Sequence, residues 1–131
     1  MNNIKKPDIS SREDIKIIIE KFYDLLLEDK KMLPFFKEIV QQNHLKKHIS
    51  DIADFWSDVL FDTNSYKNNV MQKHVAKHTF MAFKKEHFII WTSYFFKSIN
   101  TKFNGEKAEL MKNRATSIAT VMQLKLEIYQ N

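Results

Sequence analysis

His48 is the side chain in this sequence whose position first suggests chemistry. It shares one face of a predicted helix with Leu45 and Ile52, because residues three and four apart are neighbours on a helix. A titratable ring that faces an apolar core needs a polar partner, since an unpartnered polar group is costly to bury. Tyr23 and His74 lie in two other segments that supply such partners. A polar pair that faces a second inward imidazole is the arrangement a buried iron cofactor needs.

The length and composition favour a single all-helical domain over residues 1–131. A chain of this length buries roughly two thirds of its unfolded surface, which leaves space for a small cofactor. It contains 1 glycine and 2 prolines, too few turn residues for a hairpin-rich β architecture. Its 11 phenylalanines, 4 tyrosines and 2 tryptophans predict a bulky core.

The absence of cysteine restricts the possible metal chemistry. It excludes disulfides, thiolate zinc sites, iron–sulfur clusters and the thioether attachment of c-type haem. Any metal must therefore be held by histidine, by a carboxylate or within a cofactor.

The sequence also argues against a membrane protein, a secreted protein and a nucleic-acid-binding protein. No stretch approaches the roughly 18 consecutive apolar residues of a membrane span, so we expect no membrane association. Residues 1–8 hold no apolar signal region, so we expect a cytoplasmic protein. The net charge of +5 could attract nucleic acid, but lysines spread over helices are more typical of a solvated face. Nucleic-acid binding is therefore disfavoured.

Apolar periodicity predicts helices with wide apolar faces, which pack around a shared core rather than in a narrow coiled-coil seam. The predicted helices cover residues 10–29, 43–61, 70–78, 84–102 and 106–129. Residues 1–9 are expected to form a flexible arm, and Ser10 with Glu13 fits a capping box. The segment 32–36 is expected to be a short apolar connector that Pro34 keeps from being regular helix.

Taken singly, the polar residues have ordinary explanations. Tyr23 is typical of a tyrosine whose ring is buried and whose hydroxyl contacts water. His48 is typical of a core histidine that has a hydrogen-bond partner. His74 is followed four residues later by His78, a spacing that could bind zinc, but no third or fourth ligand is obvious nearby. Trp56 and Trp91 are large core residues on this interpretation.

Several short motifs nevertheless occur in a characteristic order. They are Phe22-Tyr23, Pro34-Phe35-Phe36, the His48 and Trp56 pair, Met71-Gln72-Lys73-His74, and the run from Glu86 to Trp91. With the C-terminal runs 105–110 and 114–123, this pattern resembles the group III truncated haemoglobins of bacteria. The resemblance covers about residues 10–129 and implies a truncated globin fold, a two-over-two helical sandwich around haem.

The resemblance also implies a role for each site residue. His74 would be the metal ligand, bound to the iron of haem b. Tyr23, His48 and Trp91 would be the distal residues that stabilise a bound ligand. The residues that it assigns to cofactor binding are His74, Phe35, Phe36, Ile52, Trp56, Tyr66, Met71 and Lys73.

The chain departs from the family pattern at three places. The loop that starts at Tyr66 lacks the usual glycine and proline, and a proline often found in the segment 79–83 is absent. Ile90 stands where an arginine often precedes the tryptophan. If that arginine binds a haem propionate in other members of the family, another cation must do so here. Lys73 is the nearest candidate, followed by Lys77.

The expected function is that of a b-type haem protein that binds dioxygen, nitric oxide or another diatomic ligand at a five-coordinate iron. Two donors, Tyr23 and Trp91, suit retention of the ligand more than rapid delivery. Redox chemistry, namely nitric oxide dioxygenation or peroxide use, is therefore expected rather than bulk oxygen transport. Such chemistry needs a reductase, which the sequence does not identify.

Three alternatives stay open at this stage. The first is a gas-sensing or electron-transfer haem protein without turnover. The second is a helical nucleic-acid-binding module that uses the basic surface. The third is an interaction bundle without cofactor, in which His48 and Tyr23 merely satisfy one another.

Overall fold

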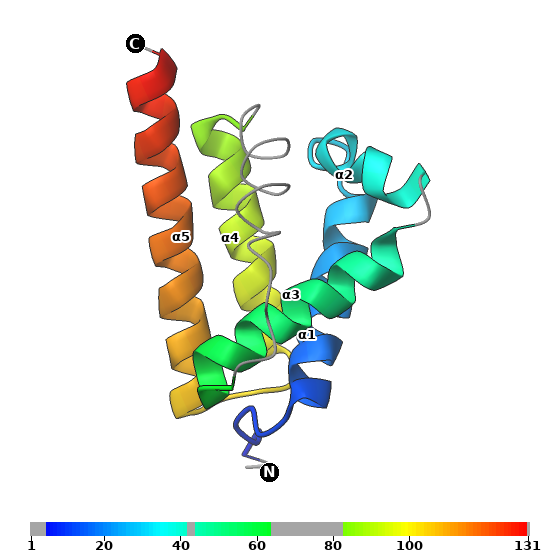
Figure 1. Ribbon diagram of the computed structural model, residues 1–131, viewed down its shortest axis with the longest axis vertical. Helices are drawn as coiled ribbons and strands as arrows, with labels where there is room; N and C mark the ends of the chain where they lie inside the picture. Colours follow the sequence, from blue (N-terminus) through cyan, green and yellow to red (C-terminus); the bar gives the residue numbers. More distant parts are fainter. Residues whose placement is uncertain (1–4, 42–43, 64–82, 131) are drawn as a thin grey trace.

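The computed structural model describes residues 5–41, 44–63 and 83–130. Within these ranges the chain forms helices and no strand (Figure 1). The helices are α1 (Arg12–Glu28), α2 (Leu33–Gln41), α3 (Leu45–Phe61), α4 (Lys85–Asn100) and α5 (Glu106–Gln130). The predicted all-α class is confirmed, and four of the five predicted helices match these boundaries closely. The predicted helix 70–78 lies outside the described residues.

The helices pack as two crossing pairs. α4 and α5 run side by side in opposite directions, and α3 crosses in front of them (Figure 1). α1 packs against both α3 and α4, so it connects the two pairs, while the short α2 packs against the end of α1. None of the described helices has the length and apolar character needed to cross a membrane.

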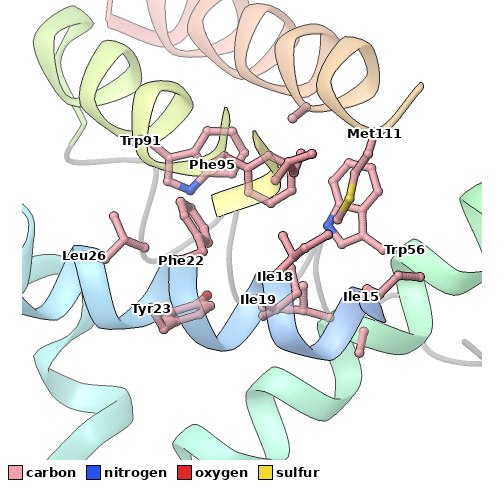
Figure 2. Close-up of a cluster of buried hydrophobic side chains, with 14 of the residues drawn as sticks. Ile15, Ile18, Ile19, Phe22, Tyr23, Leu26, Trp56, Trp91, Phe95 and Met111 are labelled. Atoms are coloured by element: carbon pink, nitrogen blue, oxygen red, sulfur yellow. The ribbon is translucent and has the colours of Figure 1, made fainter. Parts of the chain in front are cut away.

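The core lies where α1 meets α4. Ile15, Ile18, Phe22 and Leu26 follow one another along the buried face of α1 at helical spacing. In Figure 2 these side chains point towards α4, where Trp91 and Phe95 lie, while Trp56 of α3 and Met111 of α5 close one end. Aromatic rings therefore supply much of the volume between the two helix pairs.

The cap of α1 lies one residue later than the sequence predicted. Ser11, not Ser10, is the N-cap, and its hydroxyl accepts a hydrogen bond from the Asp14 N–H at 3.2 Å. Asp14 Oδ2 in turn accepts bonds from the Ser10 N–H at 2.9 Å and the Ser10 hydroxyl at 3.0 Å. Asp14 thus takes the role expected for Glu13, because a cap at Ser11 makes Asp14 the third residue of the helix.

The part of the expected N-terminal arm that the structure describes is anchored, contrary to the prediction. Asp8 accepts hydrogen bonds from the N–H groups of Lys107 at 2.8 Å and Ala108 at 2.9 Å, in the first turn of α5. The N–H of Asn104 donates to the Pro7 carbonyl at 3.0 Å, and Ile9 is only 2% exposed. The first N–H groups of a helix need acceptors, and Asp8 supplies them from a distant part of the chain.

Gly105 permits this close approach of the arm to α5. Its φ of +148° lies in a region that side chains rarely adopt, and a Cβ there would lie 2.5–2.9 Å from Asp8. Gly105 is the only glycine of the chain, and it stands where the anchored arm crosses the start of α5.

The expected connector at 32–36 is instead the start of α2. Pro34 lies in the first turn, where backbone N–H groups have no partner within the helix, so its missing N–H costs nothing. Asp29 fixes the preceding turn, because its Oδ1 accepts from the N–H of Lys31 at 2.8 Å and of Met32 at 3.1 Å. The proline therefore starts the helix rather than interrupting it.

Candidate functional site

Tyr23 and His48 form a hydrogen-bonded pair between α1 and α3. The Tyr23 hydroxyl oxygen lies 2.7 Å from His48 Nε2, and the two rings meet edge to face with centroids 5.4 Å apart. Tyr23 is 3% exposed, whereas His48 is half-buried. The two residues singled out in the sequence as inward polar groups are thus in direct contact.

Burial raises the pKa of the Tyr23 phenol well above its ordinary value, because a phenolate would lose its hydration in this core. The phenol is therefore neutral and carries a single O–H donor. If His48 Nε2 is unprotonated, that O–H donates to it. If Nε2 carries a proton, the N–H donates to the phenol oxygen and leaves the Tyr23 O–H to point at a third group. The protonation of one ring nitrogen thus decides where the phenol proton points.

Aromatic rings hold the phenol in place. The Phe36 ring of α2 meets the Tyr23 ring edge to face at 5.6 Å, and Phe22 does so from the neighbouring position on α1 at 5.6 Å. Phe36, which the resemblance assigned to cofactor binding, is 2% exposed. The Phe36 and Phe22 rings therefore hold the Tyr23 ring, and with it the position of the phenol oxygen.

A polar contact near the start of α1 sets the crossing of α1 and α3. Arg12 Nε donates to Asp54 Oδ1 at 2.8 Å, and Arg12 Nη2 donates to the Ser50 hydroxyl at 3.0 Å and carbonyl at 3.2 Å. Ser50 and Asp54 lie on α3 within two turns of His48. This contact therefore helps to hold His48 within hydrogen-bonding distance of Tyr23.

Trp91 of α4 is buried in the same core, but the ring contacts that the structure records connect it to Tyr23 through Phe22. Its indole is parallel to the Phe95 ring with centroids 5.7 Å apart, and Phe22 meets it edge to face at 5.6 Å. Phe22 accordingly lies between Trp91 and Tyr23 (Figure 2). That Trp91 and Tyr23 donate to one ligand stays a prediction.

Three other residues that the resemblance assigned to cofactor binding lie in the described part of the chain, and Trp56 lies apart from the other two. Ile52 lies one turn beyond His48 on the buried face of α3, and Phe35 is half-buried and contacts Phe83 at 4.7 Å. Trp56 packs instead on Phe95, with centroids 5.3 Å apart, in the core between α3 and α4. Trp56 therefore lies farther along the core than the residues around His48.

The remaining predicted site residues lie outside the described residues. They are His74, Tyr66, Met71 and Lys73, together with the alternative ligand His78 and the alternative cation Lys77. Over 5–41, 44–63 and 83–130, no group of three or more histidine, aspartate or glutamate side chains could hold a metal ion. Iron binding by His74 and zinc binding by His74 with His78 both stay predictions.

Two contacts escaped the analysis of the sequence. His87 Nδ1 accepts from the Lys84 N–H at 2.9 Å, so it caps α4, and its ring packs on Phe35 at 4.8 Å. The Tyr94 hydroxyl donates to Asp29 Oδ2 and joins α4 to the turn after α1. Lys84 and His87 do not fit the Ser/Thr and Glu/Gln pattern of a capping box, so no sequence signal indicated the first contact. No local signal indicates the second.

The chemistry of the described residues fits the distal side of a haem. A neutral O–H and imidazole pair lies within apolar and aromatic side chains, which is the environment that a polar gas ligand on an apolar ring requires. Leu45 lies three residues before His48 on α3, and Phe35 precedes Phe36 on α2. Both are half-buried and pack against the same core.

Comparisons with known proteins agree with this geometry. The chain is 29% identical over 121 residues to the group 3 truncated hemoglobin ctb of Campylobacter jejuni subsp. jejuni, covering 91% of this chain and 93% of the relative. The crystal structure of group III truncated hemoglobin from Campylobacter jejuni superposes with a TM-score of 0.79 and 28% identity, over 92% of this chain and 94% of that one. No protein-family model matches the chain. Over more than nine tenths of both chains, this chain is therefore similar in sequence and in fold to group III truncated haemoglobins.

Proposed function

We propose that this protein binds haem b, holds its iron with His74 and uses it to bind dioxygen, nitric oxide or another diatomic gas. The observation that carries the proposal is the hydrogen bond between buried Tyr23 and half-buried His48, the two residues to which the resemblance gives distal roles. His74 would hold the haem, which would supply an iron able to bind a diatomic gas. The described residues then determine how that ligand is oriented and retained.

Tyr23 is the main hydrogen-bond donor to the ligand. Its phenol stays neutral because of burial, and the rings of Phe22 and Phe36 hold the phenol ring in place before a ligand arrives. A donor that is already oriented in a dry pocket stabilises a developing negative charge without reorganisation. A hydrogen bond to a charged acceptor contributes about 1.5–3 kcal/mol, which corresponds to roughly a ten- to hundredfold slower escape of the ligand.

His48 controls whether that donor is available. It is half-buried, so it is partly exposed to solvent while it contacts the buried phenol. When its Nε2 carries the proton, the Tyr23 oxygen accepts that bond and the O–H is directed to the ligand. His48 is therefore a positioning residue for Tyr23, and Trp91 is a second donor on this proposal.

Retention of the ligand favours redox chemistry over delivery. We propose that the haem-loaded protein would oxidise nitric oxide to nitrate with dioxygen or would use peroxide, and that a separate reductase would supply the electrons. Loss of nitric oxide from solution with formation of nitrate, in the presence of a chemical reductant, is the expected result. Rapid dissociation of dioxygen without any nitrate formation would contradict this part of the proposal.

The direct test of the cofactor is its colour. Purified protein mixed with haem should show a Soret band, and His74→Ala should lose that band or shift it strongly. His44→Ala is the matched control, because His44 is an exposed histidine at the start of α3 whose side chain makes no capping bond. A protein that stays colourless with haem, or a His74→Ala variant with an unchanged spectrum, would refute the proposal.

A further inference from the structure

The Tyr23–His48 pair has the geometry of a proton-coupled redox site. The phenol oxygen and the imidazole nitrogen lie 2.7 Å apart, within the range over which a proton moves directly between two heavy atoms. The phenol is buried, so water does not compete for its proton, while His48 is half-buried. An imidazole is a stronger base than a carboxylate, which suits it to accept a phenol proton.

We propose that Tyr23 is a redox-active tyrosine and that His48 is its proton acceptor. When a one-electron oxidant takes an electron from the Tyr23 ring, the O–H proton moves to His48 Nε2. The products are a neutral tyrosyl radical, an imidazolium and the reduced oxidant. A one-electron reductant reverses the step, and the imidazolium returns the proton to the phenol oxygen.

The surrounding core extends this site into a line of oxidisable rings. Phe22 contacts both Tyr23 and Trp91 with centroid separations of 5.6 Å. Phe95 lies 5.7 Å from Trp91 and 5.3 Å from Trp56. A single phenylalanine therefore separates each oxidisable ring from the next, from Tyr23 through Trp91 to Trp56 (Figure 2).

In this arrangement, oxidation that begins at either tryptophan ends at Tyr23. An electron vacancy formed on either tryptophan can pass towards Tyr23 across one intervening ring at a time. At Tyr23 the loss of the proton to His48 removes the positive charge from the ring, which is favourable in an apolar core. The inference concerns the chain itself and does not depend on haem, so a colourless protein would leave it standing.

Tyr94 provides a natural comparison within the same chain. Its hydroxyl also donates to a side chain of another segment, but the acceptor is the Asp29 carboxylate. Asp29 already accepts bonds from the N–H groups of Lys31 and Met32, so it is a weak acceptor for an additional proton. Tyr94 should therefore not hold the radical.

The test uses the purified full-length protein with a flash-quenched tris(bipyridine)ruthenium complex as the one-electron oxidant. Electron paramagnetic resonance of rapidly frozen samples, with ring-deuterated tyrosine as the label, should show a tyrosyl radical. The signal should vanish in Tyr23→Phe and persist in Tyr94→Phe. A signal that persists in Tyr23→Phe, vanishes in Tyr94→Phe or belongs to tryptophan would overturn the proposal.

His48→Gln tests the proton acceptor separately. Glutamine can still accept the hydrogen bond but cannot take up the proton, so the tyrosyl yield should fall about tenfold, the factor that corresponds to about 1.4 kcal/mol. Radical formation in heavy water should be slower than in water for the unmodified protein, and this isotope effect should be lost in His48→Gln. An unchanged yield and isotope effect in this variant would refute the role of His48, and circular dichroism of each variant checks its fold.

Discussion

Two tyrosines of this chain donate or accept hydrogen bonds between helices, and their surroundings differ. Tyr23 is buried among aromatic rings and pairs with His48, whereas Tyr94 is half-buried and pairs with Asp29. Burial raises the pKa of Tyr23, but the hydrogen bond to Asp29 is the main cause that raises the pKa of Tyr94. In the first pair the direction of the hydrogen bond depends on the tautomer of His48, while the second pair fixes a turn with a carboxylate whose pKa is lowered.

This difference indicates that the Tyr23–His48 hydrogen bond suits a ligand site, whereas the Tyr94–Asp29 hydrogen bond stabilises the fold. Asp29 receives three donors, two of them backbone N–H groups, so its position is set by the turn between α1 and α2. The bond between His48 and Tyr23 differs, because its direction depends on the tautomer of the imidazole. A pair whose direction can change suits a ligand site, and an over-determined carboxylate suits an anchor.

Removal of the Tyr23 hydroxyl should have the largest effect. We expect Tyr23→Phe to speed dioxygen release by roughly ten- to hundredfold, because one charge-assisted hydrogen bond of about 1.5–3 kcal/mol is lost. Stopped-flow measurement of gas release from the haem-loaded protein gives this rate. Tyr94→Phe is the control and should leave the rate unchanged. Equal acceleration in both variants would show that the two pairs do not differ in function.

Loss of the Asp29 carboxylate should affect stability rather than gas release. Asp29→Ala removes the acceptor for Tyr94, Lys31 and Met32, so we expect the free energy of unfolding to fall by about 1.5–3 kcal/mol. Urea denaturation followed by circular dichroism measures this quantity. Tyr94→Phe should cost less, because it leaves both backbone bonds to Asp29 in place. A larger loss in Tyr94→Phe than in Asp29→Ala would contradict the anchor role.

Acid should weaken the two carboxylate anchors. The hydrogen bond from Tyr94 lowers the pKa of Asp29, and backbone N–H groups lower that of Asp8 despite the opposing effect of burial. A lowered pKa in the folded state means that the stabilisation is complete above the unfolded pKa of about 3.9 and is lost as the pH falls through the folded pKa. Stability should therefore decline below about pH 4, and less steeply in Asp29→Asn. Equal slopes in both proteins would exclude a contribution from Asp29.

The smallest effect concerns tyrosine ionisation. Both raised pKa values mean that neither Tyr23 nor Tyr94 should ionise near pH 10, the ordinary range for a phenol. Spectrophotometric titration should therefore give the same number of phenols ionising in that range for Tyr23→Phe and for the unmodified protein. One phenol fewer in the variant would show that water reaches Tyr23.

Much of the site could be predicted from the sequence because its polar residues lie on regular helices. Helical spacing places His48 on the same face as Ile52, and the apolar stripe of α1 carries the neighbouring Phe22 inward. The start of α2 was mistaken for a connector, because Pro34 blocks helix only after the first turn. The arm was wrongly expected to fray between residues 5 and 9, because the acceptor role of Asp8 involves residues 99 and 100 positions away.

The sequence by itself determined which segments form helices and which of their faces are apolar, because both follow from interactions between residues three and four apart. Only the tertiary structure decided that Phe22 separates Tyr23 from Trp91, that Arg12 ties α1 to α3 and that Tyr94 pairs with Asp29. These contacts depend on the angles and registers at which helices cross. No local pattern encodes those angles, since they result from the packing of all side chains in the shared core.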